Sequence, residues 1–395
     1  MKKSSGKTVK RSAKAMNETI LKSKEFEQSI THETERKFVP IFPERLNELR
    51  ERSRPIEHIQ LSHPSEPFSL RIRETLCNDG SLCYVACLKS RGEITDQGLK
   101  RMEVEVEVPS ELYHYYKTSD TPYARKLRTT YERDVVIDYY EDGYVQCESE
   151  SAAAWQAFIE QYGDAFVEVT GDRSADNEWR THLQYRREHN GQEALVPAPE
   201  LDTDHMANEI FLAYTQHSPV IVRIAGRSGS GKSTIVRQVQ EKLRGYGLSS
   251  DVISTDDYHR GSTWLTQYNN GDPWMQWDHP VVYDTATMAA NIQRLIDGES
   301  IPRREIDFSI VEPVYNGDIT PTPVLIIEGI YALSADFSGF KTLDYEVPTP
   351  VATCIGRRLL RDMRERPQFA NPADSLRYML EQTEPMWREQ LASRQ

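Results

Sequence analysis

The segment from Val220 to Ser233 constrains the fold more than any other part of the 395-residue chain. An apolar run ending at Ala225 leads into Gly226-Arg-Ser-Gly-Ser-Gly-Lys-Ser233, which fits the pattern G-x-x-x-x-G-K-[ST]. The run predicts a buried strand and the residues after Ser233 predict a helix, so the glycines lie where strand gives way to helix. There, the loop's backbone N–H groups and the helix N-terminus point at one anion. The segment therefore predicts a phosphate-binding loop in an α/β domain with a parallel sheet.

The residue types of this loop suit a nucleotide. Glycine lets the backbone wrap a phosphate closely, Lys232 can reach the β- and γ-phosphates, and Ser233 offers a hydroxyl to Mg²⁺. A glycine turn that binds nothing is the alternative, and the flanking strand and helix argue against it. We expect ATP to be bound by Gly226, Ser228, Gly229, Ser230, Gly231, Lys232, Ser233 and Thr234.

Three segments farther along the chain resemble those of the uridine kinase and phosphoribulokinase family. They are the acidic and aromatic Ser254–Gly261, the segment Trp277-Asp-His-Pro280, and Val324–Ile330, a predicted strand ending in a carboxylate. An acidic turn that caps a helix is the alternative for the first of them. The resemblance implies a catalytic base at Asp256, a catalytic Lys232, acceptor contacts from Tyr258, Arg260 and Asp278, and a magnesium ligand, acting through water, at Glu328.

A basic run from Gly356 to Arg366 resembles the lid of the same family, which neutralises charge on the transferred phosphoryl group. The resemblance implies catalytic roles for Arg358 and Arg361, whereas a solvated basic helix face is the alternative. The residues that read the base in uridine kinases have only a partial match, Arg304-Glu-Ile-Asp-Phe308. A nucleoside similar to uridine or cytidine is therefore the leading acceptor, with a phosphorylated sugar or a pantothenate-like alcohol as alternatives.

The N-terminal half predicts short antiparallel strands. Turn sequences at Asn78-Asp-Gly80 and Glu141-Asp-Gly143 separate neighbouring segments that alternate between apolar and polar residues. The apolar spacing of Ala152–Tyr162 predicts a short helix. The predicted strands are Glu33–Phe38, Ser69–Arg73, Leu82–Leu88, Arg101–Val108, Arg128–Tyr131, Val135–Tyr140, Tyr144–Glu150 and Phe166–Thr170.

Charged residues alternate along several of these strands. Glu33, Glu35 and Lys37 share one strand face, which is a costly arrangement inside a barrel unless ligands compensate the charge. Similar alternation recurs at Arg71 with Arg73 and from Arg101 to Glu107. A single such strand could be an exposed face, but the repetition favours a closed barrel lined by cations for phosphates and by carboxylates for Mg²⁺ or Mn²⁺.

This pattern, with Glu-x-Glu-x-Lys at Glu33, Glu35 and Lys37, resembles the CYTH family of triphosphate tunnel metalloenzymes over about residues 30–185. The resemblance implies a catalytic Lys37, phosphate contacts from Arg71, Arg73, Lys89, Arg101 and Arg128, and metal ligands at Glu33, Glu35, Glu148 and Glu150. Such tunnels hydrolyse inorganic or nucleoside triphosphates, and a few cyclise ATP. A barrel that only binds a triphosphate and regulates the kinase is a further alternative.

The composition of the chain excludes some classes of function and location. A net charge of −13 argues against broad binding to nucleic acid, and no apolar run is long enough for a membrane span. The five cysteines lack paired spacing, so we expect reduced structural thiols in a cytoplasmic protein, as a monomer or an oligomer. The predicted layout is a disordered basic tail (1–29), a tunnel domain (30–185), a linker (186–204) and a kinase domain (205–395).

Overall fold

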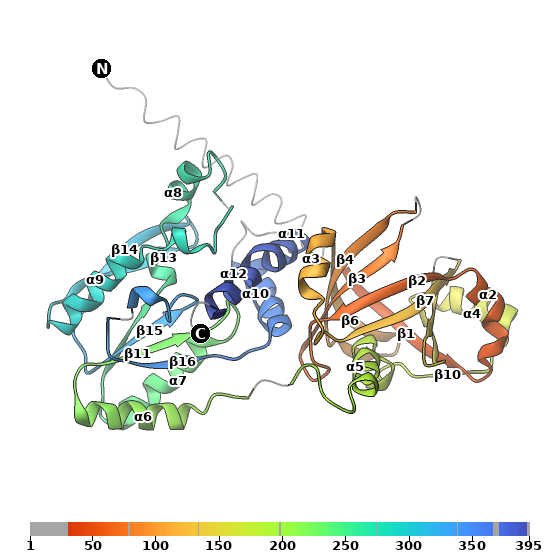
Figure 1. Cartoon of the computed structure of the whole chain (residues 1–395), viewed down its shortest axis with the longest axis horizontal. Coiled ribbons are helices and arrows are strands. Elements are labelled where there is room, and N and C mark those ends of the chain that lie inside the picture. The colour runs from red at the N-terminus through yellow and green to blue at the C-terminus, as the bar shows by residue number, and fades with distance from the viewer. Residues whose placement is uncertain are drawn as a thin grey trace, which may run out of the picture. The chain divides into compact units, whose positions relative to one another are not determined.

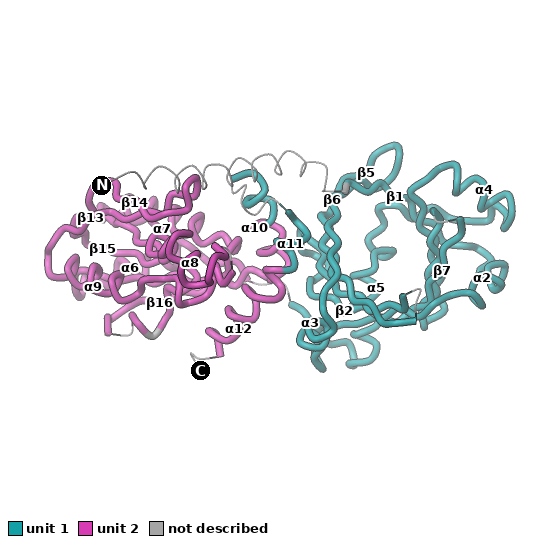
Figure 2. Tube along the Cα trace, turned by 90° about the horizontal axis from the view of Figure 1, so that it is seen from above, with its two compact units in different colours: residues 1–197, 359–377 teal, residues 198–358, 378–395 magenta. Residues whose placement is uncertain are grey.

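The chain forms two compact units in a computed structural model that describes residues 31–77, 80–132, 134–196, 199–273, 275–337, 339–365 and 371–392. One unit consists of residues 1–197 with 359–377, and the other of residues 198–358 with 378–395 (Figure 2). The predicted tail, residues 1–29, lies outside the described residues, and the predicted domain boundaries stay a prediction. Within the described ranges no helix is long and apolar enough to cross a membrane.

The N-terminal unit is a closed antiparallel β-barrel (Figure 1). Around the ring the strands are β1 (Thr31–Pro40), β9 (Val145–Ser149), β8 (Val135–Tyr140), β7 (Tyr123–Tyr131), β2 (Arg54–Gln60), β3 (Phe68–Leu76), β4 (Leu82–Ser90) and β6 (Gly98–Glu107). The ring closes because β1 pairs with both β9 and β6. The short strands β10 (Phe166–Glu168) and β5 (Glu93–Thr95) extend it. This confirms the predicted class of the N-terminal half.

The apolar core of this unit lies on the outside of the ring, because successive residues of a strand point to opposite faces. Ile137 and Tyr139 on β8 are buried in one cluster with Phe158 of helix α4 (Ala152–Tyr162), whose bounds match the predicted helix. The short helices η1 (Pro43–Leu46) and α2 (Asn47–Glu51) complete that cover, and α3 (Ser110–Tyr116) contacts β3 and β4. The inward faces are therefore left to charged side chains.

The sequence pattern does not predict helix α5 (Asn177–Glu188), the short helix η2 (Arg173–Ala175) or strands β2 and β5. Helix α5 buries a polar face that includes Asn177, Glu178, Thr181 and His182, so it lacks the apolar period by which helices are detected. Strand β2 contains Pro55 and charged residues, which weaken a strand prediction.

The expectation that all five cysteines are reduced is wrong for one pair. Cys77 and Cys83 form a disulfide, with Cα atoms 5.9 Å apart. The antiparallel hairpin of β3 and β4 brings these residues side by side although six positions separate them. Cys87, Cys147 and Cys354 are free and buried.

The C-terminal unit is built on a parallel sheet in the order β12 (Ser250–Ser254), β15 (Val324–Gly329), β11 (Val220–Ala225) and β16 (Thr342–Glu346). Helices α6 (Thr203–Gln216) and α7 (Lys232–Gly245) share a core with one face, and α9 (Thr285–Ile296) and α12 (Glu384–Ala392) share a core with the other. The remaining elements are η3 (Asp256–Tyr258), α8 (Gly261–Tyr268), η4 (Pro280–Val282), the hairpin β13 (Ile301–Asp307) with β14 (Glu312–Ile319), η5 (Ala335–Phe337), the first half of α10 (Val351–Glu365) and the π-helical turn Met379–Thr383. The rest of α10, from Leu359, and α11 (Pro372–Tyr378) up to Arg377 belong to the barrel unit. The predicted α/β class is confirmed.

Phe158 tests the core of the barrel unit. Its side chain is fully buried among the rings of Tyr131, Trp155, Tyr162 and Phe166. Phe158→Ala should lower the free energy of unfolding of this unit by about 3–5 kcal/mol, because it removes a buried ring and leaves a cavity. Urea unfolding measures the change, and Tyr115→Ala, at a residue that is 43% exposed, is the control. Equal losses in the two variants would contradict this packing.

Candidate functional sites

The glycine loop of the C-terminal unit has the shape that a phosphate requires. Gly229 and Gly231 adopt φ angles of 82° and 93°, in the left-handed region that favours glycine. A Cβ on Gly229 would also overlap the carbonyl oxygen of Cys354. The Lys232 Nζ atom donates to the carbonyl oxygens of Gly226 and Arg227, at 3.0 Å each, so the ammonium group folds back over the loop. All eight predicted ATP contacts, Gly226 to Thr234 without Arg227, belong to this turn and the first residues of α7.

Glu328 brings a buried negative charge to the same edge of the sheet. It pairs in register with Ile224 of β11, directly before the loop, and with Ser254 of β12. Its Oε2 atom is buried without a hydrogen-bond partner. Burial raises the pKa of Glu328, the charge of Lys232 lowers it and that of Asp256 raises it. An orphaned carboxylate oxygen near the loop fits a hard divalent cation such as Mg²⁺.

Two aspartates follow β12 at this edge. Asp256, the predicted base, lies in η3, and its backbone N–H donates to Ser254 Oγ at 3.2 Å. Its neighbour Asp257 is more strongly perturbed: burial, followed by the charge of Asp256, raises the pKa of Asp257 to about 7. A carboxylate with a pKa near neutrality suits general base catalysis. The sequence gives both residues, but only the folded environment distinguishes them.

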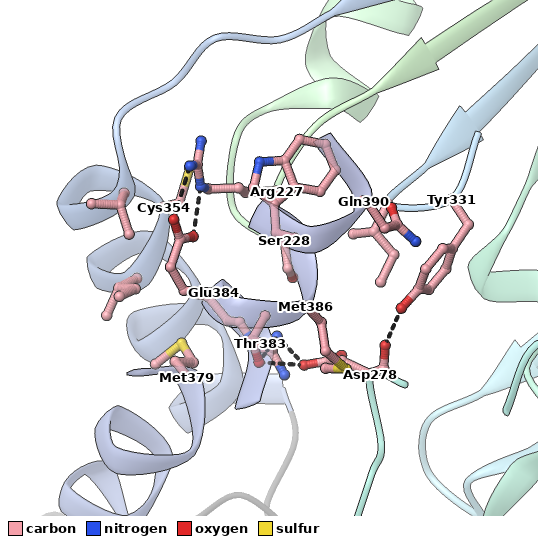
Figure 3. A pocket seen from close by; sticks show the side chains of 15 residues that line it. Arg227, Ser228, Asp278, Tyr331, Cys354, Met379, Thr383, Glu384, Met386 and Gln390 are labelled. Atoms are coloured by element: carbon pink, nitrogen blue, oxygen red, sulfur yellow. Dashed lines mark hydrogen bonds and ion pairs between the residues drawn. The ribbon is translucent and has the colours of Figure 1, made fainter. Parts of the chain in front are cut away.

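A pocket lies beside the phosphate loop (Figure 3). At its polar end Asp278 Oδ2 accepts from Arg358 Nη1 at 2.6 Å and from Thr383 Oγ1 at 2.7 Å, and the Asp278 carbonyl accepts from Tyr331 at 2.5 Å. Its apolar wall is formed by Ile330, Val351, Ile355, Met379, Met386 and Trp387. Burial, and then the charges of Asp256 and Asp278, raise the pKa of Tyr283, so both predicted aspartates lie near this group.

Arg227 and Glu384 also line the pocket, and sequence reasoning missed both. The Arg227 guanidinium donates twice to the buried Glu384 carboxylate, at 2.7 and 2.9 Å, which joins the loop to helix α12 (Figure 3). The position of Arg227 in the G-x-x-x-x-G-K-[ST] pattern is variable, so the motif gives no signal for it.

Two predicted acceptor residues lie elsewhere in the unit. The Tyr258 ring is buried in an apolar core, where its hydroxyl accepts from Asn291 at 2.9 Å. Arg260 donates to the Val281 carbonyl at 3.3 Å, lies 3.5 Å from Asp284 and packs over the Trp264 ring. Neither side chain is among those that line the pocket at Asp278. Their predicted roles stay predictions.

The arginines of α10 face in different directions. Arg358 is buried and paired with Asp278, whereas Arg357 is exposed and has a guanidinium nitrogen 3.7 Å from where a Cβ on Gly231 would lie. Arg361 belongs to the segment 359–377 and donates to Asp362. Adjacent helix positions differ by about 100° in direction, so a run of arginines cannot all face one phosphate. Sequence reasoning missed Arg357, which is the arginine beside the loop.

In the barrel, β1 carries two carboxylates into a network of ion pairs. Glu33 Oε1 accepts from Lys89 Nζ at 2.6 Å and from Arg101 Nε at 2.5 Å. Glu35 Oε1 accepts from Arg101 Nη2 at 2.6 Å. These four predicted residues come from three strands, β1, β4 and β6, that are neighbours in the closed ring. The ring therefore assembles them on its inner face, as the alternation predicts.

Lys37 and Arg128 also lie inside the ring. The Lys37 Nζ atom lies 3.3 Å from Glu35, 3.9 Å from Glu148 and 2.9 Å from Asp176. Arg128 donates to both oxygens of Asp138 at 2.7 Å each and lies 4.0 Å from Glu148. Although burial raises the pKa of Asp138, the nearby charges of Arg128 and Lys126 outweigh it and lower the pKa. Glu150 follows β9 and is exposed.

Arg71 and Arg73 of β3 are the least compensated cations of this interior. The nearest paired carboxylate of Arg73, Glu105, lies 3.6 Å away, and Arg73 Nε is buried without a hydrogen-bond partner. Among the described residues no carboxylate lies within 4.0 Å of the Arg71 guanidinium. A guanidinium group with a buried spare donor, as in Arg73, suits a polyanionic ligand.

The predicted residues of the barrel interior leave out five side chains that also face inward. Lys126 and Asp138 form a buried pair at 2.5 Å, and Cys87, Glu103 and Glu105 place ligand atoms within 4.8 Å of one another. All five follow the same inward alternation as the predicted residues, so the pattern contains the signal for them. It does not show which of the alternating residues come close together in space.

Comparisons with known proteins find relatives of the C-terminal half. The profile of the phosphoribulokinase / uridine kinase family matches residues 221–371. A uridine kinase of Aeromonas salmonicida is 34% identical over 159 residues, which cover 38% of this chain and 72% of that protein. One of Deinococcus deserti is 30% identical over 170 residues, which cover 42% of this chain and 79% of that protein.

A solved inorganic triphosphatase is 20% identical to this chain, covering 38% of it and 95% of the other protein, with a TM-score of 0.24. A likeness of that size supports no inference about activity.

The raised pKa of Asp257 makes stability depend on pH. Between its ordinary pKa of 3.8 and about 7, the folded state holds a proton that the unfolded state has lost, so the free energy of unfolding falls as pH rises. Asp257→Asn removes this loss. Its free energy of unfolding, relative to that of the wild type, should therefore rise by at least about 1 kcal/mol between about pH 4 and pH 7. Urea unfolding at both pH values measures it, with Glu241→Gln, on the exposed side of α7, as the control. A pH-independent difference would contradict the shift.

Proposed function

This chain belongs, through residues 221–371, to the phosphoribulokinase and uridine kinase family, and we propose that this part transfers the γ-phosphate of ATP to a hydroxyl group of a nucleoside or related alcohol. One observation carries the proposal: the glycine loop, the orphaned carboxylate of Glu328 and the pocket at Asp278 belong to one unit. A donor site, a metal ligand and a polar acceptor pocket are the parts that phosphoryl transfer needs.

Different residues of this unit have different roles in the proposed reaction. The loop N–H groups and Lys232 hold the phosphates, and Arg357 adds positive charge beside Gly231. Ser233 and Glu328 would hold Mg²⁺, which would supply positive charge to offset that of the phosphates. Asp256 or Asp257 accepts the proton of the attacking hydroxyl group, and the pKa of Asp257 near 7 favours Asp257 for this step.

The acceptor enters the pocket beside the loop. Asp278, held by Arg358 and Thr383, presents a fixed carboxylate to the hydroxyl groups of a sugar or alcohol. The methionines and Trp387 give an apolar wall for the base of a nucleoside, and Asp278 lies at the polar end for its sugar. A nucleoside similar to uridine is the acceptor that the relatives support best. The phosphorylated sugar and the pantothenate-like alcohol are the alternatives.

The first test follows the label from γ-labelled ATP with Mg²⁺ and a mixture of nucleosides. The wild type should produce a labelled nucleoside monophosphate, and Lys232→Ala should reduce the rate about 100-fold or more, because it removes a cation from the transferred phosphate. Lys242→Ala, in the last turn of the same helix, and Lys37→Ala, in the barrel, should retain it. Label found only as free phosphate, and lost in Lys37→Ala, would contradict the kinase assignment.

A second function is favoured by the barrel interior. We propose that it binds a triphosphate with Mg²⁺ or Mn²⁺ and hydrolyses it, and that binding alone, as a sensor for the kinase, is the alternative. Arg71 and Arg73 supply spare guanidinium donors for phosphate oxygens. Glu33, Glu35 and Glu148 would supply metal ligands opposite them, and carboxylate oxygens are the ligands that these cations prefer.

Calorimetric titration with inorganic triphosphate and Mg²⁺ tests this second function. Arg71→Ala should weaken binding by about 10-fold or more, because each hydrogen bond to a charged group contributes about 1.5–3 kcal/mol. Arg125→Ala is the matched control, since this residue lies on the outer side of the ring and pairs with Glu57. If both variants bind triphosphate like the wild type, the tunnel assignment is wrong. Release of phosphate by the wild type then separates hydrolysis from sensing.

A further inference from the structure

Helix α5 lies across one end of the barrel. Strands β1, β2, β4 and β8 run in one direction around the antiparallel ring, so their C-terminal ends meet at the same end. The segment that begins with Asp176 and continues through α5 touches all four of these ends, and its partners there are Lys37, Ser62, Arg91 and Asp142. Contacts this widely spread around the ring place the helix over the opening.

The same helix also reaches the interior. Asn177 Oδ1 accepts from Lys126 Nζ and from the Tyr140 hydroxyl, both at 2.6 Å. Thr181 Oγ1 lies 2.8 Å from Nε2 of His58. Thr181 is fully buried, so solvent does not reach the helix at this position. The contacts explain why α5 buries a polar rather than an apolar face.

On four of the strands, exposure of the inward side chains rises with distance from α5. On β1 it is 1% at Lys37, 4% at Glu35 and 8% at Glu33. On β6, which runs the opposite way, side-chain exposure is 15% at Glu103 and 40% at Glu105.

Two more strands show the same trend. Exposure rises from 2% at Lys126 to 19% at Arg128 on β7, and from a fully buried Gln146 to 15% at Glu148 on β9. Interior side chains on four strands are therefore sealed at the α5 end and open to solvent at the other end.

We propose that the barrel interior is a pocket with one mouth, which admits a linear polyphosphate only by a free terminal phosphate. The inference rests on the proposed triphosphate binding and adds a rule for which phosphate compounds qualify. A leading phosphate passes Glu105 and Arg73 near the mouth, reaches Arg71, and stops at the wall formed by α5. A nucleoside on the leading end has no exit through this wall, whereas a nucleoside on the trailing end stays in solvent.

This geometry selects ligands by the substitution of their ends. Inorganic triphosphate has two free ends and ATP has one, so both satisfy the rule. Diadenosine triphosphate carries a nucleoside at each end, and cyclic trimetaphosphate has no terminal phosphate. Both lack the group that must enter first, although they carry three phosphates like the others.

Competition with inorganic triphosphate on the wild-type full chain, with Mg²⁺ present, tests the inference in calorimetry. The bound triphosphate is assigned to the barrel by its loss in Arg71→Ala. ATP should displace it, and diadenosine triphosphate and trimetaphosphate should displace it at least about 30-fold less well, since each loses charge-assisted hydrogen bonds at the closed end.

Each result has a separate meaning. Displacement by diadenosine triphosphate within about threefold of ATP would mean that the interior has a second opening, and would overturn the one-mouth pocket. Triphosphate binding that is absent, or unchanged in Arg71→Ala, would instead remove the proposed tunnel function, and the rule for free ends with it.

Discussion

Glu328 holds one carboxylate oxygen in the interior without a hydrogen-bond partner, and the functional edge of the C-terminal sheet is arranged around that carboxylate. An isolated buried charge is costly, so it persists only where a ligand or an opposite charge completes it. The parallel sheet places the glycine loop after β11 and Asp256 after β12 beside it, because the carboxyl ends of all these strands meet at one edge. Lys232 is the nearest cation to offset it.

The barrel also holds charged side chains in its interior, but it compensates most of them with ion pairs. Its apolar core lies outside the ring, between the strands and their covering helices, so the inner face is free to carry charge. Most of that charge is paired within the protein, as Asp138 is by Lys126 and Arg128. Buried pairs of this kind add little net stability, but they hold side chains in fixed positions. The less compensated arginines, Arg71 and Arg73, are then the groups that an anionic ligand would complete.

Local patterns predicted the elements that repeat a simple period or fit a motif. Strand β11, the glycine loop and helix α4 follow from a buried apolar run, a motif and an apolar spacing, and the structure has them within a residue of the prediction. The inward charge of the barrel followed from alternation in the same way. Helix α5 could not be predicted because its buried face is polar, and the wall that we propose it forms depends on partners at the ends of four strands.

The candidate sites show the same division between local and long-range information. Motif positions gave Lys232, Asp278 and Glu328, whereas Arg227 and Glu384 face each other from opposite ends of the unit's sequence. Arg357 and Arg358 are neighbours in the chain but face different partners, which only the helix geometry reveals. The raised pKa of Asp257 comes from burial and from neighbouring carboxylates, so no sequence position encodes it alone.

The most direct measurement is the affinity of a non-hydrolysable ATP analogue for the wild type and for Glu328→Gln, each with and without Mg²⁺. If the buried carboxylate completes a metal–nucleotide site, Mg²⁺ should tighten binding to the wild type by about 10-fold or more, and the variant should lose most of that gain while keeping its affinity without Mg²⁺. An equal Mg²⁺ effect in the two proteins would contradict the account, because Glu328 would then have no part in holding the nucleotide's metal ion.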